Sequence, residues 1–301
     1  MTRPHHELFQ QAAAVFTPED RLSNVHFLKH FHAASETAKK DLFEHPEFFK
    51  SLKLKLNEAI NELMEVYNSA GHSCITALTI PSDPEKALKL YADIFFFCKA
   101  FETDDDTKLS SELQKLSTEH HNPYAIFFLI ELKSKSFDIT TCDRAPKTVD
   151  EIFKASDEVY TLLDCFEQKC TLYYFTEIKI ASDFVMLFED IEEQDYANHY
   201  LQRYVASLIL FYKLREKEPH SINNVLNAED VDSILNDYPS AETLDELIED
   251  VKYCFDDDTW GIVTQRVDTL FQEVNLQSLN DRRDEKITLP DEGLKQASMT
   301  A

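Results

Sequence analysis

The sequence predicts an all-α fold, an irregular helical bundle or a solenoid of helical hairpins, with about a dozen helices in one or two lobes. The first observation behind this prediction is that the 301 residues include only three glycines, although average usage of about 7% would give roughly twenty. Sheets use glycine in hairpin turns and bulges, so its scarcity favours helices. The second is that apolar residues recur at steps of three or four, and the third is that polar caps and prolines precede many of these stretches.

Helix-start signals and apolar periodicity place the expected helices in order along the chain. The first begins at the sequence TPED, residues 17–20, where threonine stands at an N-cap and proline at the first helical position. The others cover residues 46–67, 82–101, 107–117, 123–137, 148–180, 184–191, 196–217, 228–236, 241–255 and 260–274. The IFFFC run within 82–101 is apolar on all sides and predicts a helix with several neighbours. Within 148–180, the LYYF run is also compatible with a short strand.

A segment without periodicity divides the chain into two helical regions. This segment, CDRAPK at residues 142–147, contains a proline and follows an expected helix. We therefore expect an N-terminal helical region at 1–141 and a C-terminal helical region at 148–279. Residues 280–301 are polar and rich in small side chains, which predicts a disordered tail.

The scarcity of glycine also excludes several classes of enzyme. A Rossmann loop needs three closely spaced glycines, a Walker loop needs G-x-x-x-x-G-K, and a hydrolase elbow needs G-x-S-x-G. Gly71, Gly261 and Gly293 are too far apart to form any of these loops. We therefore expect no nucleotide cofactor.

The formal net charge of −26 at pH 7 predicts a protein partner rather than a nucleic acid. An acidic surface repels phosphate backbones and anionic lipids, and it complements a basic or amphipathic surface on another protein. The same acidity would also serve simply to keep an aromatic-rich chain in solution. No apolar run reaches the about 18 residues of a membrane span, and no signal peptide is visible at the N-terminus.

Six cysteines without a C-x-x-C pair predict reduced core residues and a reducing, cytoplasmic compartment. Cys165 and Cys170 lie within an expected helix, where burial is the simplest explanation of both. His26 and His30 have the one-turn spacing that a zinc site can use, but no H-E-x-x-H glutamate accompanies them. We assign no residue as catalytic, as a cofactor contact or as a metal ligand.

Two aspartate triplets are the most unusual local feature of the sequence. One lies in AFETDDDT, residues 100–107, and the other in CFDDDTWG, residues 254–261. All-helical isoprenoid synthases hold magnesium through D-D-x-x-D, because carboxylates one helical turn apart can share a metal. In this chain the distal position of that motif is Lys108 after the first triplet and Trp260 after the second. The metal interpretation therefore fails at a ligand position in both places.

Helix capping explains the triplets more simply. Apolar stripes precede and follow the second triplet, which places it in a turn between two helices. We expect Asp257 or Asp258 to accept hydrogen bonds from the first N–H groups of the following helix, and Asp106 to precede the helix after the first triplet. Trp260, the only tryptophan, is either a core residue or a partner contact. The candidate partner-binding residues are Asp104, Asp105, Asp256, Asp257, Asp258 and Trp260.

The composition and the C-terminal tail resemble those of secreted effectors from Legionella-type intracellular bacteria. The tail combines acids with small residues, namely Asp284, Glu285, Asp291, Glu292, Ala297, Ser298 and Thr300. It is similar to the C-terminal signals that type IV secretion machinery reads, which implies translocation into a host cell. Some non-enzymatic members of this group bind and restrain another effector, and the chain resembles these more than the enzymatic members.

Together these observations predict a protein-interaction module that acts as an adaptor or inhibitor of a partner protein and is not an enzyme. The alternative is an enzyme with dispersed acidic, histidine or cysteine residues, in the form of a divalent-metal-dependent hydrolase or transferase. A third interpretation is a structural helical module within a larger assembly. A deep pocket where two carboxylates and a histidine converge would favour the enzyme.

Overall fold

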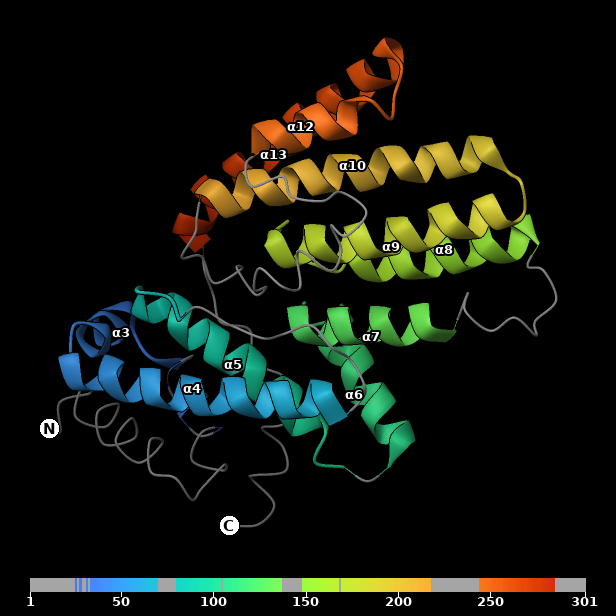
Figure 1. Ribbon diagram of the computed structural model, residues 1–301. Helices are drawn as coiled ribbons and strands as arrows, with labels where there is room; N and C mark the ends of the chain where they lie inside the picture. Colours follow the sequence, from blue (N-terminus) through green and yellow to red (C-terminus); the bar gives the residue numbers. More distant parts are fainter. Residues whose placement is uncertain are drawn as a thin grey trace, which may run out of the picture. The chain divides into compact units, whose positions relative to one another are not determined.

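The computed structural model describes residues 33–69, 80–103, 105–136, 148–167, 169–217 and 244–284, together with residues 25, 27, 28 and 31. Within these residues the chain forms ten helices and no strand, which confirms the all-α prediction (Figure 1). The chain divides into two compact units, which part between His120 and His121. The predicted connection at 142–147 lies outside the described residues, and the regions predicted on either side of it stay predictions.

The first unit is built on two long helices that pack against each other. These are α4 (Pro46–Ser69) and α5 (Pro84–Ala100). The shorter α3 (Glu36–Phe43) packs on α4, and α6 (Asp106–Thr118) packs on α5. The side chain of Asp83 caps α5 by accepting from two backbone N–H groups, one position before the proline that the sequence places at the helix start.

The core of the first unit follows the predicted apolar patterns. The buried stripe of α4 comprises Phe48, Leu52, Leu56, Ile60, Leu63 and Tyr67. By contrast, α5 is buried on nearly all sides, as its IFFFC run predicts, and eleven of its 17 residues are buried. The two helices meet where Tyr67 stacks on Phe97 with ring centroids 5.4 Å apart.

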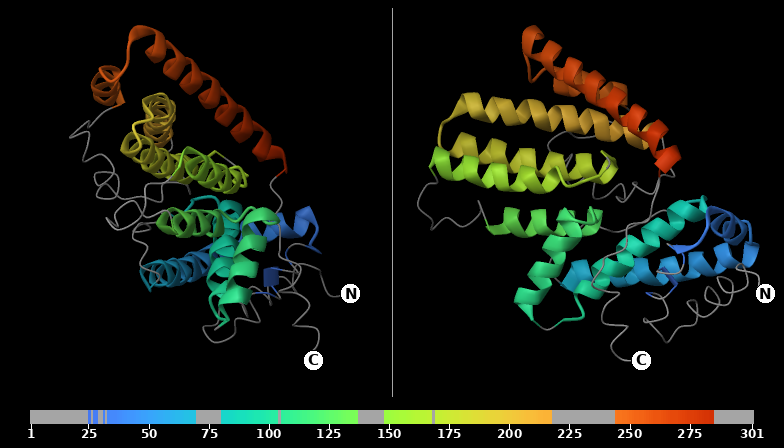
Figure 2. Two further views of the ribbon diagram at one scale, coloured as in Figure 1. Left: turned by 90° about the vertical axis from the view of Figure 1, so that its right-hand side faces the viewer. Right: turned by 180° about the vertical axis from the view of Figure 1, so that it is seen from behind.

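The second unit contains the remaining six helices. They are α7 (Pro123–Ser136), α8 (Val149–Leu163), α9 (Thr171–Asp190), α10 (Gln194–Lys217), α12 (Leu244–Lys252) and α13 (Asp257–Asp284). The most extensive helix contact joins α9 and α10, and α8 packs on both α7 and α9. The α12–α13 hairpin packs on α10, as the view from behind in Figure 2 shows. None of the described helices is long and apolar enough to cross a bilayer.

The expected single helix at 148–180 is two helices in the structure. The chain turns between Leu163 and Thr171, although residues 164–170 contain neither glycine nor proline. A contact from another part of the chain stabilises this turn, because the His121 ring Nδ1 lies 2.8 Å from the Cys165 carbonyl oxygen. Cys165 and Cys170 therefore lie in a turn and not within a helix. The LYYF run is helical and opens α9, so the strand alternative is wrong, and the helix expected at 184–191 is the end of α9.

Several other helix boundaries differ from the expectations by a few residues. Asn122 caps α7 as predicted, since its Oδ1 accepts from Tyr124 N and Ala125 N, each at 3.1 Å. The last helix begins at Asp257 rather than Trp260 and continues to Asp284. The expected helices at 17 and at 228–236 lie outside the described residues, as do His26 and His30.

The described cysteines differ in burial more than the sequence suggested. Cys98 is buried in α5 as a core residue. Cys165 and Cys170 are half-buried, whereas Cys254 is exposed, so the expectation of a core position is wrong for Cys254. Cys254 lies in the short turn between α12 and α13, where few other residues can cover it.

Candidate functional site

The turn between α12 and α13 carries an exposed aromatic surface. The Tyr253 side chain is 86% exposed, and Ile262, at the start of α13, is 56% exposed. Between them, the half-buried rings of Phe255 and Trp260 stack with centroids 6.3 Å apart and an interplanar angle of 28°. Large apolar side chains that gather at an exposed turn are typical of contact surfaces. We call residues 253–262 the hairpin tip.

Negative charge surrounds the hairpin tip. Between Leu244 and Gly261 the chain has seven carboxylates and one lysine. The carboxylates are those of Asp245, Glu246, Glu249, Asp250, Asp256, Asp257 and Asp258, and all seven residues are exposed. Their field attracts a positively charged partner and repels an anionic one.

The second aspartate triplet caps α13, but through a different residue from the one predicted. Asp256 Oδ1 accepts from the Thr259 backbone N–H at 2.7 Å, so Asp256 is the cap and neither Asp257 nor Asp258 is. The helix begins three residues before its apolar stripe, because Asp257 and Asp258 favour the positive end of the helix dipole and form its first turn. The Thr259 N–H, and next its hydroxyl, hold the pKa of Asp256 below the ordinary value.

Trp260 occupies a position between the core and the solvent. Phe255 covers one side of the Trp260 ring. The side chains of α13 that face the core are those of Val263 and Val267, which are both buried. A Cβ atom added at Gly261 would meet no atom within 4 Å, so the helix surface next to Trp260 is open. A partner could therefore reach the tryptophan without any rearrangement of the described residues.

The first aspartate triplet makes a similar cap in different surroundings. Asp105 Oδ1 accepts from Thr107 N at 2.9 Å and from Lys108 N at 3.2 Å, whereas Asp104 lies outside the described residues. Asp106 is the first residue of α6 rather than a residue before it. The cap is one residue away from the expected place in both triplets, because each helix begins within its triplet.

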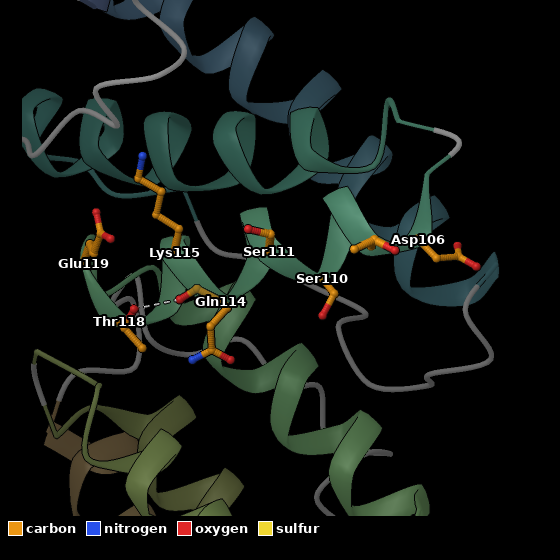
Figure 3. Close-up of a pocket in the computed structure, with 8 residues that line it drawn as sticks. Asp106, Ser110, Ser111, Gln114, Lys115, Thr118 and Glu119 are labelled. Atoms are coloured by element: carbon orange, nitrogen blue, oxygen red, sulfur yellow. Dashed lines mark hydrogen bonds between the residues drawn. The ribbon is translucent and has the colours of Figure 1, made fainter.

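A shallow hollow of about 780 Å³ runs along α6 after this cap (Figure 3). Its lining is polar and rich in hydroxyl groups, among them those of Ser110, Ser111 and Thr118. All but one of the lining residues belong to α6, and the other, Glu119, directly follows it. The Thr118 hydroxyl is already bonded to the Gln114 carbonyl oxygen at 2.9 Å. A hollow with a single helix for its wall is an open surface, and it has no aromatic side chain to hold a partner.

The two triplets belong to different units of the chain. Of the predicted residues, Asp256, Asp257, Asp258 and Trp260 share the hairpin tip, and Asp105 lies at the start of α6. Within the described part of the chain, no group of three or more His, Cys, Asp or Glu side chains is placed to hold a metal ion.

A buried ion-pair network in the second unit was not among the predicted features. Glu177 of α9 is only 1% exposed. Its Oε1 accepts from Arg203 Nη2 at 2.8 Å and Nε at 3.2 Å, and its Oε2 accepts from the Ser207 hydroxyl at 2.8 Å. Arg266 of α13 approaches the same carboxylate, with Nη2 3.8 Å from Oε1. We call these four residues the Glu177 centre.

Aromatic rings enclose the Glu177 centre. The guanidinium carbon of Arg203 lies 3.8 Å from the centroid of the Tyr160 ring, a cation–π contact. Burial raises the pKa of Tyr160, Tyr173 and Tyr174 far above the ordinary value, so their hydroxyls stay neutral. Burial, together with the positive charges of Arg203 and Arg266, lowers the pKa of His199.

The geometry of the Glu177 centre suits a structural role. A general base must have an oxygen available to a substrate proton. Both oxygens of Glu177 are already engaged, by Arg203 and by Ser207. The centre therefore joins α9, α10 and α13. Neither oxygen of Glu177 is available to accept a proton from a substrate.

No known protein-family model matches the chain, and neither a curated protein nor a solved structure is significantly similar to it.

Helical spacing is the signal from which the Glu177 centre could have been found. Thr171, Tyr174 and Glu177 recur every three residues in α9, whose sequence is otherwise strongly apolar. His199, Arg203 and Ser207 recur every four residues in α10, so each set lies on one helix face. Polar side chains on the buried face of an apolar helix must find partners on a neighbouring helix. The sequence does not reveal which helix that is.

Proposed function

We propose that the chain is a protein-interaction module that acts as an adaptor or inhibitor of a partner protein, with the hairpin tip as its contact surface. The observation that supports this proposal is the exposed side chains of Tyr253 and Ile262 beside the half-buried ring of Trp260. Aromatic residues are enriched at binding hot spots, where a partner removes them from water. Exposed carboxylates around that surface provide the polar rim that such interfaces have.

The charge of the tip favours a basic, amphipathic segment as the partner. Lysine and arginine side chains can pair with Asp257 and Asp258, and a guanidinium can stack on the Tyr253 or Trp260 ring. An apolar side of the same segment can cover Ile262. Nucleic acids and anionic lipids do not fit, because their phosphates would meet seven carboxylates and one lysine.

A role in secretion remains part of the proposal. The composition and the acidic, small-residue tail resemble those of type IV secretion effectors, so we place the module among secreted bacterial effectors or their regulators, acting in a reducing cytoplasm. The enzyme alternative stays a prediction. The most deeply buried carboxylate, Glu177, does not favour it, because two side chains already occupy its oxygens.

The test of this proposal is a binding titration with a basic amphipathic peptide. A fluorescein-labelled helical peptide with one lysine face and one leucine face is titrated with the full chain, and its anisotropy gives Kd. We expect Trp260→Ala to weaken binding at least about tenfold, as for a hot-spot aromatic. The double variant Asp257→Asn/Asp258→Asn leaves the Asp256 cap intact, and it should weaken binding about fivefold in 50 mM salt and less in 300 mM salt.

Two substitutions at Gly261 provide a matched pair. Gly261→Ala adds one methyl group to an open helix surface and should leave Kd unchanged. Gly261→Arg places a positive charge beside Trp260 and should weaken the binding of a basic peptide. Asp106→Asn, in the first turn of α6, is the control for loss of an exposed aspartate elsewhere. Equal Kd values for the wild type, Trp260→Ala and Gly261→Arg would contradict the proposal.

A further inference from the structure

The α12–α13 hairpin, residues 244–284, packs on α10 with few buried apolar side chains. Among its described side chains, those buried are Leu247, Val251, Val263 and Val267. By contrast, α9 buries thirteen of its 20 residues. Because hydrophobic stabilisation scales with the apolar area removed from water, the hairpin is held less firmly than the helices beneath it.

Ion pairs from α13 to the two helices beneath it supply much of the remaining attachment. They are Arg266 to Glu177 at 3.8 Å, Asp268 to Lys213 at 3.8 Å, and Glu273 to Lys169 at 3.1 Å. Lys169 lies two residues before α9, and Lys213 belongs to α10. On α13, the side chain of Arg266 is 37% exposed, that of Asp268 is 72% exposed and that of Glu273 is 51% exposed. Salt therefore screens the pairs of Asp268 and Glu273, and it screens the Arg266 pair less because Glu177 is only 1% exposed.

The interface beneath α13 also leaves polar atoms unsatisfied. The Tyr174 hydroxyl and Arg266 Nε are buried, and neither has a hydrogen-bond partner among the described residues. Tyr174 lies close to α13, since the charges of Glu273 and Arg266 both act on its hydroxyl. Burial of such groups without partners opposes docking, and release of α13 would return them to water.

We propose that the α12–α13 hairpin is a docked arm that three ion pairs hold onto α9 and α10, and that loss of these pairs releases it. Four buried apolar side chains favour the docked state, unsatisfied polar atoms oppose it, and the ion pairs decide the balance. Raised ionic strength therefore shifts the arm toward the released state. Release of the arm removes Arg266 from the Glu177 centre and exposes that side of the Glu177 carboxylate to water.

This device regulates the hairpin tip, and that consequence rests on the proposed function. A basic partner that binds the tip and extends along α13 meets Asp268 and Glu273, which are exposed and already paired with lysines. The positive side chains of the partner compete with Lys213 and Lys169 for these carboxylates. Binding of the partner and release of the arm therefore favour each other.

Hydrogen exchange on the full chain tests the device without any partner. Peptides from residues 257–274 are compared in 50 and 500 mM sodium chloride. We expect exchange to be about tenfold faster in high salt, because a released helix frays and the two ion pairs of Asp268 and Glu273 are screened together. Peptides from α9 and α4 should exchange at the same rate in both solutions. Equal exchange of α13 in both solutions would overturn the proposal.

Charge reversal separates an ionic attachment from a merely structural contact. Lys213→Glu should make α13 exchange as fast in 50 mM salt as the wild type does in 500 mM salt. The double variant Lys213→Glu/Asp268→Lys should restore the slow exchange. Lys40→Glu, in an exposed ion pair of α3, carries the same change of charge and should leave α13 unchanged. Failure of the double variant to restore protection would overturn the proposal.

The link to partner binding has its own measurement. Lys213→Glu should bind the basic peptide about threefold more tightly than Lys40→Glu does, since both add the same charge but only the first releases the arm. Equal affinities of these two variants would overturn the coupling. The hydrogen-exchange results are independent of the proposed function, which fails if Trp260→Ala and Gly261→Arg bind the peptide as the wild type does.

Discussion

The Glu177 centre and the hairpin tip place the same kinds of groups in opposite environments. Both combine carboxylates with aromatic rings in the second unit. Glu177 is 1% exposed and has partners on two neighbouring helices, whereas Asp256, Asp257 and Asp258 are exposed and cap or open their own helix. The comparison teaches that burial, more than residue type, separates a carboxylate that holds the fold together from one that can meet a partner.

The largest expected effect is the loss of stability when the buried carboxylate of Glu177 is replaced. Glu177→Gln removes the charge and leaves the half-buried Arg203 beside a neutral amide. We expect the free energy of unfolding to fall by about 3–5 kcal/mol, since breaking a buried ion pair leaves an uncompensated charge. Urea unfolding followed by the circular dichroism of the helices measures this loss.

A double substitution shows whether the charge or the volume matters at this position. Glu177→Leu/Arg203→Leu removes both charges and should be less destabilising than Glu177→Gln. At the exposed hairpin tip, Asp258→Asn should change the free energy of unfolding by less than about 0.5 kcal/mol. If Glu177→Gln were as mild as Asp258→Asn, the contrast between the two regions would be wrong.

A third carboxylate lies between these extremes. Asp183 of α9 is partly buried near Lys179, whose Nζ donates to Glu131 of α7. Burial raises the pKa of Asp183 to about 6, while Lys179 acts in the lowering direction and Glu131 in the raising direction. In the folded state Asp183 keeps its proton to a higher pH than in the unfolded state. Its stabilising contribution is therefore full below about pH 4 and is lost as the pH rises through about 6.

Asp183→Asn should remove this dependence on pH. At pH 7.5 we expect the variant to be more stable than the wild type by about 1–2 kcal/mol, a value reduced because Asp183 keeps some contact with solvent. At pH 4 the two should have nearly equal free energies of unfolding. Urea unfolding at both pH values measures the difference. A variant that is no more stable than the wild type at pH 7.5 would show that Asp183 is adequately solvated when ionised.

Smaller effects than those at Glu177 are expected at the two caps. Asp105→Ala and Asp256→Ala should each reduce stability by about 1 kcal/mol, because each leaves N–H groups at the start of a helix without an acceptor. Hydrogen exchange of peptides from α6 and α13 locates each loss. Only Asp256→Ala should also weaken peptide binding, since Asp105 has no exposed aromatic surface beside it. Equal effects of both variants on binding would place the contact surface outside the hairpin tip.

Periodicity and capping residues were enough to predict the all-α fold and most of the helices. Asn122 before α7 and the apolar run of α5 are examples, because both act through neighbours close in the sequence. The two aspartate triplets were placed correctly in turns at helix starts, with each cap displaced by one residue. Such local features depend on the backbone of the same helix, which a sequence pattern describes well.

Contacts between distant residues could not be predicted in this way. The turn after α8 depends on His121, which is 44 residues from Cys165 in the sequence. The Glu177 centre joins residues from α9, α10 and α13, and each helix alone shows only polar positions on one face. Half-burial of Trp260 beside Phe255 likewise depends on how two helices meet. These features depend on packing between helices. Sequence periodicity shows which face of a helix is buried, but it does not show which other helix packs against that face.

Acrylamide quenching of Trp260 fluorescence tests the central claim most directly, because the chain has a single tryptophan and it lies in the hairpin tip. The quenching constant is measured for the full chain alone and with saturating basic amphipathic peptide. We expect the peptide to lower the quenching constant of Trp260 about twofold or more, because it covers the exposed part of the ring. An unchanged constant in a complex that anisotropy shows to be fully formed would contradict the account.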